Sequence, residues 1–422
     1  MCQWHMFSTD RSGAETWECV ARSNPQAQTL QAMKGMKTLR SGRNRRKWIY
    51  VLLLMGLLGL SGCGSPSSAS VEMSSQTELV KTGSMELQYA ENFAVDYYED
   101  GYKMLTTLPD SKRYLLVPEG QPVPRGLDED VSILQEPLQN IYLVASGVMD
   151  MFASVDAVDQ IRFSGQKQEN WYIQTAKDAM AAGDMIYAGK YSKPDYELLV
   201  SEGCDLAIEN RMITHSPEVV EMLQSFDIPV MIEYSSYEQH PLGKVEWVKF
   251  FGALTGKEAE AEEAFAEQTE ILEKVESGEK TGKTIAFFYV TSNGLIQVRQ
   301  STDYIPKLIE LAGGRYIFED LEDSGSGRST LNMQVEDFYA GAKDADILIY
   351  NSSIDGGVTT LDELIGKCNI LKDFKALQEG QVYCTTNDMY QQSMAIGYLL
   401  QDMHTVLTDD DTAKLRYLFL LQ

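Results

Sequence analysis

Runs of consecutive apolar residues alternate with segments of helical spacing between residues 140 and 234. The apolar runs predict strands at 141–146, 161–165, 205–209 and 229–234. The intervening segments carry apolar side chains three and four residues apart and predict helices near 148–152, 196–202 and 217–225. Strands that are apolar on both faces and alternate with helices are typical of a parallel sheet with helices packed on it.

The same alternation returns in the last third of the chain. It predicts strands at 284–290, 346–350 and 381–386, and helices near 304–311, 336–342, 390–407 and 412–421. Residues 85–117 differ, because short strand-like runs there are separated by Asn, Asp and Gly turns. That order predicts an antiparallel meander at the edge of the first lobe.

The segment from His240 to Gly278 is helical almost throughout and lies between the two alternating regions. Its first part, 240–254, is apolar on too many sides to be solvated and is expected to pack on the first lobe. Thr255 and Glu258 have the spacing of a capping box, which predicts that a second helix begins at Thr255 and crosses to the other lobe. The fold class is therefore α/β, with two Rossmann-like lobes joined by a single long α-helix. The expected parts are an N-terminal lobe (85–239), a bridging segment (240–278) and a C-terminal lobe (279–422).

A cluster of basic residues between Lys34 and Lys47 precedes an apolar run from Trp48 to Leu60. The run is short for a membrane-spanning helix but fits the core of a signal peptide. It ends in Leu60-Ser61-Gly62-Cys63, which resembles the bacterial lipobox. We therefore expect residues 1–62 to be a signal peptide with an over-extended start, Cys63 to be lipidated, and 63–84 to be a flexible tether. The alternative is a signal anchor that ends in a cysteine by chance.

Composition excludes several classes of function. The formal net charge of −26 argues against binding to nucleic acid or to anionic lipid surfaces, which need stripes of Lys and Arg. After Cys63 the histidines are His215, His240 and His404, which fall on different elements without ligand-like spacing. This disfavours a receptor for a bare metal ion, and so few histidines make a Ser/His/Asp centre hard to assemble. Cys204 and Cys384 lie beside apolar runs and are expected in the core.

Several segments, in this order along the chain, resemble the substrate-binding proteins of ABC importers for siderophores, haem and cobalamin. They are DYELL followed by CDL, EYSSYEQHPLGKVEWVKFFGALTGKEAEAEEAF, STDYIPKLIELAGGRYIF, VEDFYAGAKDADILIYNSS and TTNDMYQQ. The resemblance covers nearly the whole of 85–407 and implies the helical-backbone periplasmic-binding-protein fold. It also implies a lipid-anchored, non-enzymatic receptor on the extracytoplasmic face of the cell membrane, without a cofactor, whose partners are an ABC permease and its ATPase.

The resemblance further implies one carboxylate on each lobe that docks on the permease. Glu197 matches the first by position, and Glu336 matches the second, with Asp337 as its alternative. A carboxylate in a first helical turn also favours the helix dipole without any docking role, so that explanation stays open.

Clefts in this family lie at the carboxyl ends of the sheets, so residues that follow predicted strands are the candidate ligand contacts. Arginine pairs with anionic oxygens, and Tyr or Trp can stack on an aromatic chelator. The candidates are Arg162, Trp171, Tyr191, Arg211, Tyr234, Tyr237, Arg299 and Arg328, with Met212 and Arg315 at similar places.

The leading hypothesis is capture of a metal chelate, with a ferric siderophore first and a corrinoid or haem as alternatives. For haem, His215 or Tyr234 would be the axial ligand. A competing class is an exported two-lobed α/β enzyme or a surface interaction protein.

Overall fold

The computed structural model describes residues 3–9, 15–20, 79–322, 329–352, 357–410 and 412–422. The chain divides into two compact units, 1–74 and 75–422. In the first unit, β1 (Gln3–Thr9) and β2 (Glu15–Val20) form an antiparallel hairpin. The predicted signal core and Cys63 lie outside the described residues. None of the helices that the structure describes is both long enough and apolar enough to span a bilayer.

The first lobe of the second unit is built on a five-stranded parallel sheet in the order β10-β9-β8-β13-β14. Its strands are β8 (Ile141–Leu143), β9 (Ile161–Ser164), β10 (Ile186–Tyr187), β13 (Leu206–Asn210) and β14 (Val230–Glu233). Its helices are α2 (Val148–Ser154), α3 (Gln174–Ala182), α4 (Tyr196–Ser201) and α5 (Pro217–Ser225). Successive side chains alternate between faces: Ile208 joins the core that contains helix α6 (Pro241–Thr255), whereas Ala207 joins the cluster beneath α4 and α5. The prediction of a parallel sheet covered by helices is confirmed.

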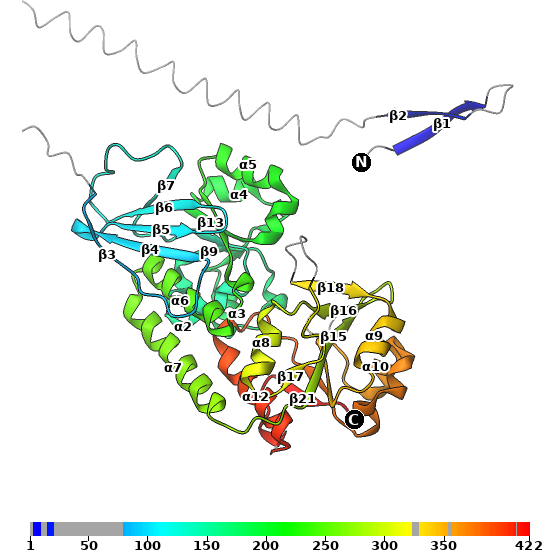
Figure 1. Ribbon diagram of the computed structural model, residues 1–422. Helices are drawn as coiled ribbons and strands as arrows, with labels where there is room; N and C mark the ends of the chain where they lie inside the picture. Colours follow the sequence, from blue (N-terminus) through cyan, green and yellow to red (C-terminus); the bar gives the residue numbers. More distant parts are fainter. Residues whose placement is uncertain (1–2, 10–14, 21–78, 323–328, 353–356, 411) are drawn as a thin grey trace, which may run out of the picture. The chain divides into compact units, whose positions relative to one another are not determined.

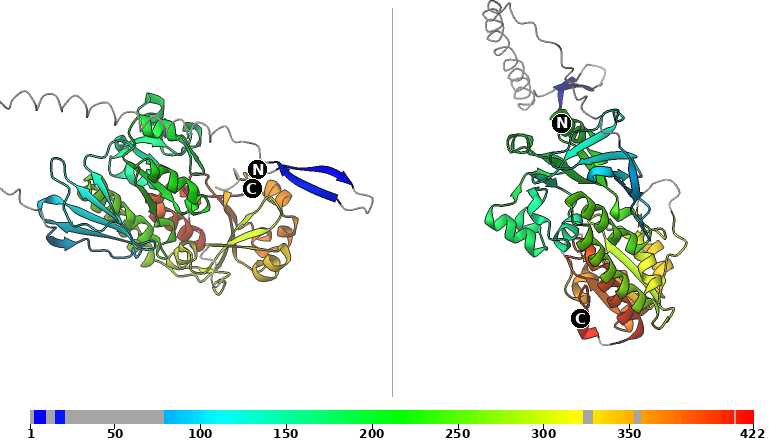
Figure 2. Two further views of the ribbon diagram at one scale, coloured as in Figure 1. Left: turned by 90° about the horizontal axis from the view of Figure 1, so that it is seen from above. Right: turned by 90° about the vertical axis from the view of Figure 1, so that its left-hand side faces the viewer.

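A second sheet of five strands precedes this one and carries the predicted meander. Its strands, in spatial order, are β3 (Lys81–Ser84), β4 (Phe93–Tyr98), β5 (Lys103–Thr107), β6 (Lys112–Val117) and β7 (Val131–Gln135). All pairs are antiparallel except β6 and β7. Thus the last residues of the predicted tether form an edge strand. Figures 1 and 2 place this sheet at the end of the unit away from the second lobe.

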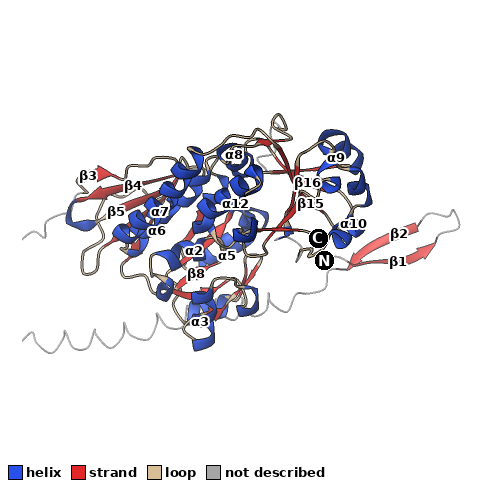
Figure 3. Ribbon diagram, turned by 90° about the horizontal axis from the view of Figure 1, so that it is seen from below, coloured by secondary structure: helices blue, strands red, loops and turns tan. Residues whose placement is uncertain are grey.

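The second lobe contains a seven-stranded mixed sheet in the order β18-β16-β15-β19-β20-β21, with β17 beside β15. The strands are β15 (Thr284–Val290), β16 (Ile296–Arg299), β17 (Arg315–Tyr316), β18 (Thr330–Met333), β19 (Ile347–Tyr350), β20 (Val382–Thr385) and β21 (Leu418–Leu420). The helices are α8 (Tyr304–Leu311), α9 (Val335–Ala342), α10 (Leu361–Lys367), α11 (Lys375–Gln378) and α12 (Ile396–Thr408). Figure 3 shows helices beside strands in both lobes, so the predicted two-lobed α/β architecture is confirmed.

The bridging segment consists of two helices, α6 (Pro241–Thr255) and α7 (Glu258–Glu276). The predicted capping box at Thr255 is wrong, because Thr255 is the last residue of α6 and its hydroxyl donates to Phe251 O at 2.7 Å. Gly256 ends α6 in the left-handed region at φ 72°, where a glycine has no steric penalty. Helix α7 then begins at Glu258 without a side-chain cap.

The two bridging helices make different contacts: α6 is buried in the core, and α7 is hydrogen-bonded to the second lobe. Helix α6 is buried along almost its whole length, which confirms that it packs as a core element. A Cβ on Gly252 would lie 2.6 Å from Ala261 Cβ, so a glycine is required where α6 and α7 cross. Helix α7 reaches the second lobe, where Gln268 Oε1 accepts from Gly397 N at 3.0 Å and Glu267 accepts from Tyr398 OH at 2.8 Å.

The predicted helix at Thr412–Leu421 is wrong. This segment forms a short 3₁₀ turn at Thr412–Lys414 and then strand β21, which pairs antiparallel with β20. The buried Asp402 of α12 accepts the backbone amides of residues 416, 417 and 418 through Oδ2, at 2.9, 2.6 and 3.1 Å. These long-range bonds hold the segment extended, and a local pattern does not reveal them.

Candidate functional site

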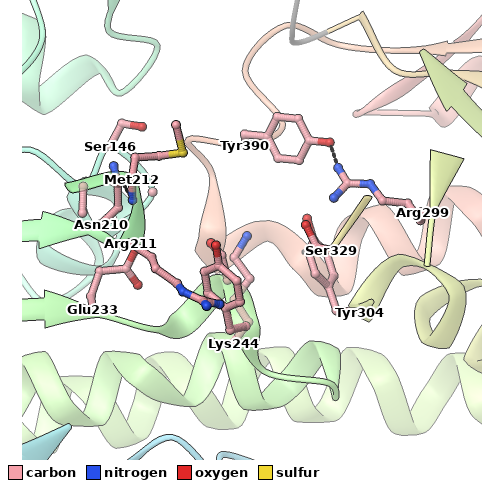
Figure 4. A pocket seen from close by; sticks show the side chains of 14 residues that line it. Ser146, Asn210, Arg211, Met212, Glu233, Lys244, Arg299, Tyr304, Ser329 and Tyr390 are labelled. Carbon is pink, nitrogen blue, oxygen red and sulfur yellow. Dashed lines mark hydrogen bonds between the residues drawn. The ribbon is translucent and has the colours of Figure 1, made fainter. Parts of the chain in front are cut away.

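A cavity of about 250 Å³ lies between the two lobes, and Figure 4 shows its walls. Three short loops line it from the first lobe, directly after β8, β13 and β14. The end of β16, the start of α8 and the loop before α12 line it from the second lobe. Its lining residues are Ala145, Ser146, Gly147, Asn210, Arg211, Met212, Glu233, Ser236, Tyr237, Lys244, Arg299, Tyr304, Ser329 and Tyr390. The cavity therefore lies at the carboxyl ends of the first-lobe strands, where binding sites of open α/β sheets are found.

The first-lobe wall carries a stacked cation and a buried carboxylate. The Arg211 guanidinium lies 4.6 Å from the centre of the Tyr237 ring. Asn210 Oδ1 accepts from Met212 N at 2.8 Å and fixes the turn after β13. Glu233 Oε2 accepts from the Ser235 amide at 2.8 Å and from the Ser235 hydroxyl at 2.5 Å. Burial raises the pKa of Glu233, and the two bonds from Ser235 act in the opposite direction.

The second-lobe wall is a hydrogen-bonded group around Arg299. This side chain donates to Asp303 Oδ2 at 3.3 Å and to the hydroxyl of Tyr390. The same hydroxyl accepts from Asn351 Nδ2 at 2.7 Å. Asp303 is fixed in turn because its Oδ1 caps α8 by accepting from Ile305 N at 3.0 Å. Arg299 thus enters the cavity with its position set by two bonded neighbours, Asp303 and Tyr390, which are themselves held in place.

Lys244 rises from α6 between the two walls (Figure 4). Lys244 is only 3% exposed, and its ammonium lies 4.8 Å from the centre of the Tyr304 ring. Burial lowers the pKa of Lys244, while Glu233 and Tyr390 favour the charged form. Lys244 is not among the residues that the sequence pattern predicts as ligand contacts. The available signal was a lysine near the start of a largely apolar helix that also carries Glu246 and Lys249.

The structure brings only some of the predicted contacts together. Arg211, Tyr237 and Arg299 line the cavity, and Met212 joins them. Arg328 lies outside the described residues. The predicted positions that do not line the cavity are Arg162, Trp171, Tyr191, Tyr234 and Arg315.

The local contacts of these residues explain why they lie outside the cavity. Trp171 is fully buried in the core, where its Nε1 donates to Ser164 Oγ at 3.0 Å. Arg162 pairs with Glu202 at 3.0 Å and donates to the carbonyls of residues 183 and 184, both at 2.8 Å. These bonds hold its guanidinium at the C-terminal end of α3, away from the cleft.

The two tyrosines are packing residues in this arrangement. Tyr191 packs against the cluster beneath α4 and α5, and Tyr234 is 6% exposed, with its ring 6.4 Å from that of Tyr237. Arg315 forms an exposed pair with Glu319 at 3.7 Å. Neither His215 nor Tyr234 lines the cavity, so the geometry gives no support to either as an axial ligand of haem.

The proposed docking carboxylates are both exposed and both lie in a first helical turn. Glu197 is in α4, which begins where Asp195 Oδ1 accepts from Leu198 N at 3.2 Å. Glu336 is in α9, with Asp337 next to it and also exposed. Their docking role stays a prediction.

Within the described ranges, no group of three or more His, Cys, Asp or Glu side chains is arranged to hold a metal ion. Cys204, Cys368 and Cys384 are buried as free thiols, which confirms the core positions expected for Cys204 and Cys384.

Three comparisons place the chain among known proteins. No protein-family model matches it. Two lipoproteins of Methanocaldococcus jannaschii are relatives by sequence, and both are named as uncharacterized. MJ0878 is 24% identical over 396 residues, covering 85% of this chain and 92% of the relative, and MJ0872 is 23% identical over 367 residues, covering 82% and 90%.

Solved structures with a similar fold come from several bacteria. A possible iron-binding, periplasmic solute-binding protein of Staphylococcus epidermidis has a TM-score of 0.50 at 16% identity, covering 64% of this chain and 98% of its own. The periplasmic haem-binding protein HutB of Vibrio cholerae has a TM-score of 0.51 at 14% identity, covering 63% and 98%. The petrobactin-binding protein YclQ of Bacillus subtilis has a TM-score of 0.51 at 12% identity, covering 64% and 92%. At these identities the likeness establishes the fold.

Proposed function

Because this chain has the two-lobed fold of periplasmic solute-binding proteins, we propose that it is the substrate-binding lipoprotein of an ABC importer. It captures a metal chelate between its lobes, with a ferric siderophore as the first candidate, and delivers it to a membrane permease. It is held by a lipid on Cys63 at the extracytoplasmic face of the membrane. The lipoprotein names of the two archaeal relatives support this location.

The observation that carries the proposal is the composition of the cavity. Both lobes contribute to it, and each presents an arginine beside a tyrosine: Arg211 with Tyr237, and Arg299 with Tyr390. Guanidinium groups recognise anionic oxygens by charge-assisted hydrogen bonds, and aromatic rings add apolar contact area. Such a cavity suits an anionic chelate that touches both lobes.

The size of the cavity favours a compact ligand. Ligand pockets usually enclose about 300–1,000 Å³, and this one encloses about 250 Å³. A corrinoid or haem would require the lobes to move apart. A small ferric siderophore needs less movement, which ranks it before the other two candidates.

Calorimetric titration of the purified protein with ferric siderophores, a corrinoid and haem tests the proposal. We expect saturable binding of one class at micromolar affinity or better. Arg211→Ala should weaken it at least tenfold. Arg162→Ala is the matched control, because this arginine pairs with Glu202 outside the cavity and should leave affinity unchanged.

Two results would contradict the proposal. One is the absence of saturable binding by any of these compounds. The other is equal affinity of the Arg211→Ala and wild-type proteins, which would move the binding site away from this cavity.

A further inference from the structure

Within the part of the chain that the structure describes, the buried ammonium of Lys244 has no hydrogen-bond acceptor. Among the described residues, its ammonium makes one direct electrostatic contact, a cation–π interaction with the ring of Tyr304. Burying an ammonium without a partner is costly, so such a group is normally paired or hydrogen-bonded. Because Lys244 lines the cavity, a bound molecule is the available source of that partner.

The neighbouring charges do not supply the missing acceptor. Arg299 already engages Asp303 and Tyr390. Glu233 attracts Lys244 electrostatically, but within the described part of the chain the two form no direct ion pair. The hydrogen bonds that Glu233 accepts, both from Ser235, end on Oε2. Its Oε1 therefore keeps acceptor capacity beside the cavity.

Lys244 is also held firmly in place. It lies in the first turns of α6, whose neighbouring residues Leu242 and Val245 are fully buried. The N-terminal end of this helix is capped by His240 Nδ1, which accepts from Leu242 N at 3.2 Å. A donor held in one position makes a more selective bond than an exposed, flexible lysine would.

We propose that Lys244 and Glu233 form a ligand subsite that selects a chelate carrying a carboxylate left free of the metal, with an O–H or N–H donor beside it. The ammonium donates to the carboxylate, and Glu233 Oε1 accepts from the neighbouring O–H or N–H. This inference rests on the proposed function and narrows its substrate class from chelates in general to those with a carboxylate that is not bound to the metal. Neither Lys244 nor Glu233 is among the arginines and aromatic residues that the sequence suggests as ligand contacts.

Calorimetry with two iron complexes tests the subsite. Ferric citrate complexes keep carboxylate groups that are not bound to iron, and ferrichrome is a neutral trihydroxamate without a free carboxylate. We expect wild-type protein to bind ferric citrate at least tenfold more tightly than ferrichrome. Lys244→Met should abolish this preference by weakening ferric citrate binding at least tenfold while changing ferrichrome binding less than threefold.

Control variants separate recognition from folding. Lys244→Arg keeps a donor and a charge and should retain part of the preference. Lys274→Met removes an exposed lysine of α7 and should change nothing. Glu233→Gln should weaken ferric citrate binding less than Lys244→Met does. Thermal unfolding of each variant identifies any that fails to fold.

The outcomes distinguish the two proposals. If wild-type protein binds ferrichrome but not ferric citrate, the subsite is refuted and the receptor function stands. If Lys244→Met weakens both complexes equally while Lys244→Arg folds and binds normally, Lys244 is a general contact and the selectivity is refuted. If no complex in this experiment or in the wider panel binds, the receptor function itself fails.

Discussion

Gln391 of the second lobe is hydrogen-bonded to Tyr172 of the first. Its Oε1 accepts from Tyr172 N at 2.8 Å, and its Nε2 donates to Asn170 O at 2.8 Å. The residue next to it, Tyr390, lines the cavity. This double contact joins the lobes close to the cavity, so we infer that it resists their separation.

Gln391→Ala should therefore speed ligand release. A net value of about 0.5–1.5 kcal/mol for each hydrogen bond, reduced by solvent exposure, predicts dissociation roughly threefold to tenfold faster. Stopped-flow displacement of the bound chelate measures the rate. Gln381→Ala is the control, since Gln381 contacts Tyr383 inside the second lobe. An unchanged rate in Gln391→Ala would show that the contact does not gate release.

Glu246 should be essential for stability. It is fully buried, and its carboxylate accepts the amides of residues 88, 89 and 90 at 2.8–3.1 Å. Glu246→Ala leaves these amides without an acceptor and should lower the free energy of unfolding by about 3 kcal/mol or more. Urea denaturation gives the value.

The control for that experiment is Glu262→Ala. Glu262 has a side chain 60% exposed and pairs with Lys249 at 3.1 Å, so its loss should cost less than about 1 kcal/mol. Equal effects of the two substitutions would mean that the amide contacts of Glu246 contribute nothing.

Glu209 should make stability fall as the pH rises. It is fully buried in β13, neither carboxylate oxygen has a hydrogen-bond partner among the described residues, and burial raises its pKa to about 8. The folded state therefore retains a proton that the unfolded state releases above its ordinary pKa of 4.5. Stability is greatest below that value and declines up to about pH 8, by about 1.4 kcal/mol per unit.

Glu209→Met should remove this pH-dependent decline. Its free energy of unfolding should exceed that of the wild type most clearly at pH 8. Denaturant titrations at pH 5 and pH 8 give the comparison. If the two proteins lose the same stability between these values, Glu209 is ionised in both folded and unfolded states and the assignment is wrong.

The docking role predicted for Glu197 and Glu336 can be tested separately from ligand binding. Glu197→Ala and Glu336→Ala should each abolish uptake in cells while leaving the chelate affinity within twofold, because both side chains are exposed outside the cavity. Glu218→Ala removes another exposed carboxylate from a first helical turn, that of α5, and should preserve uptake. Loss of chelate affinity in Glu197→Ala would refute the docking role.

The sequence was sufficient for elements with strong local patterns. The apolar run at Thr284–Val290 became β15, and the helical pattern at Pro217–Ser225 became α5. Local patterns failed where distant residues decide the structure. Asp402 holds the segment before Leu418 extended, and Gly256 ends α6 at a place where Thr255 resembles a cap.

The candidate site was harder to predict than the fold. Placement after a strand selected Arg211 and Tyr237, and both line the cavity. The same rule selected Trp171, whose indole N–H is instead satisfied by Ser164 inside the core. Lys244 was missed because a buried charge becomes visible only when the cavity beside α6 is known.

The way in which the chain enters its second unit has a mechanical consequence. The described part of the second unit begins at Leu79, beside β3, which forms one edge of the small sheet. The loop between β3 and β4 is fastened to α6 through Glu246, and to the segment just before α6 through Glu238, which accepts the amides of Glu91 and Asn92 at 2.9 and 3.0 Å. Tension applied at the N-terminal side of this unit is therefore carried through the sheet into α6. The cavity loops after β8, β13 and β14 lie off this load path, but α6 carries Lys244, so such tension would reach the cavity through that side chain.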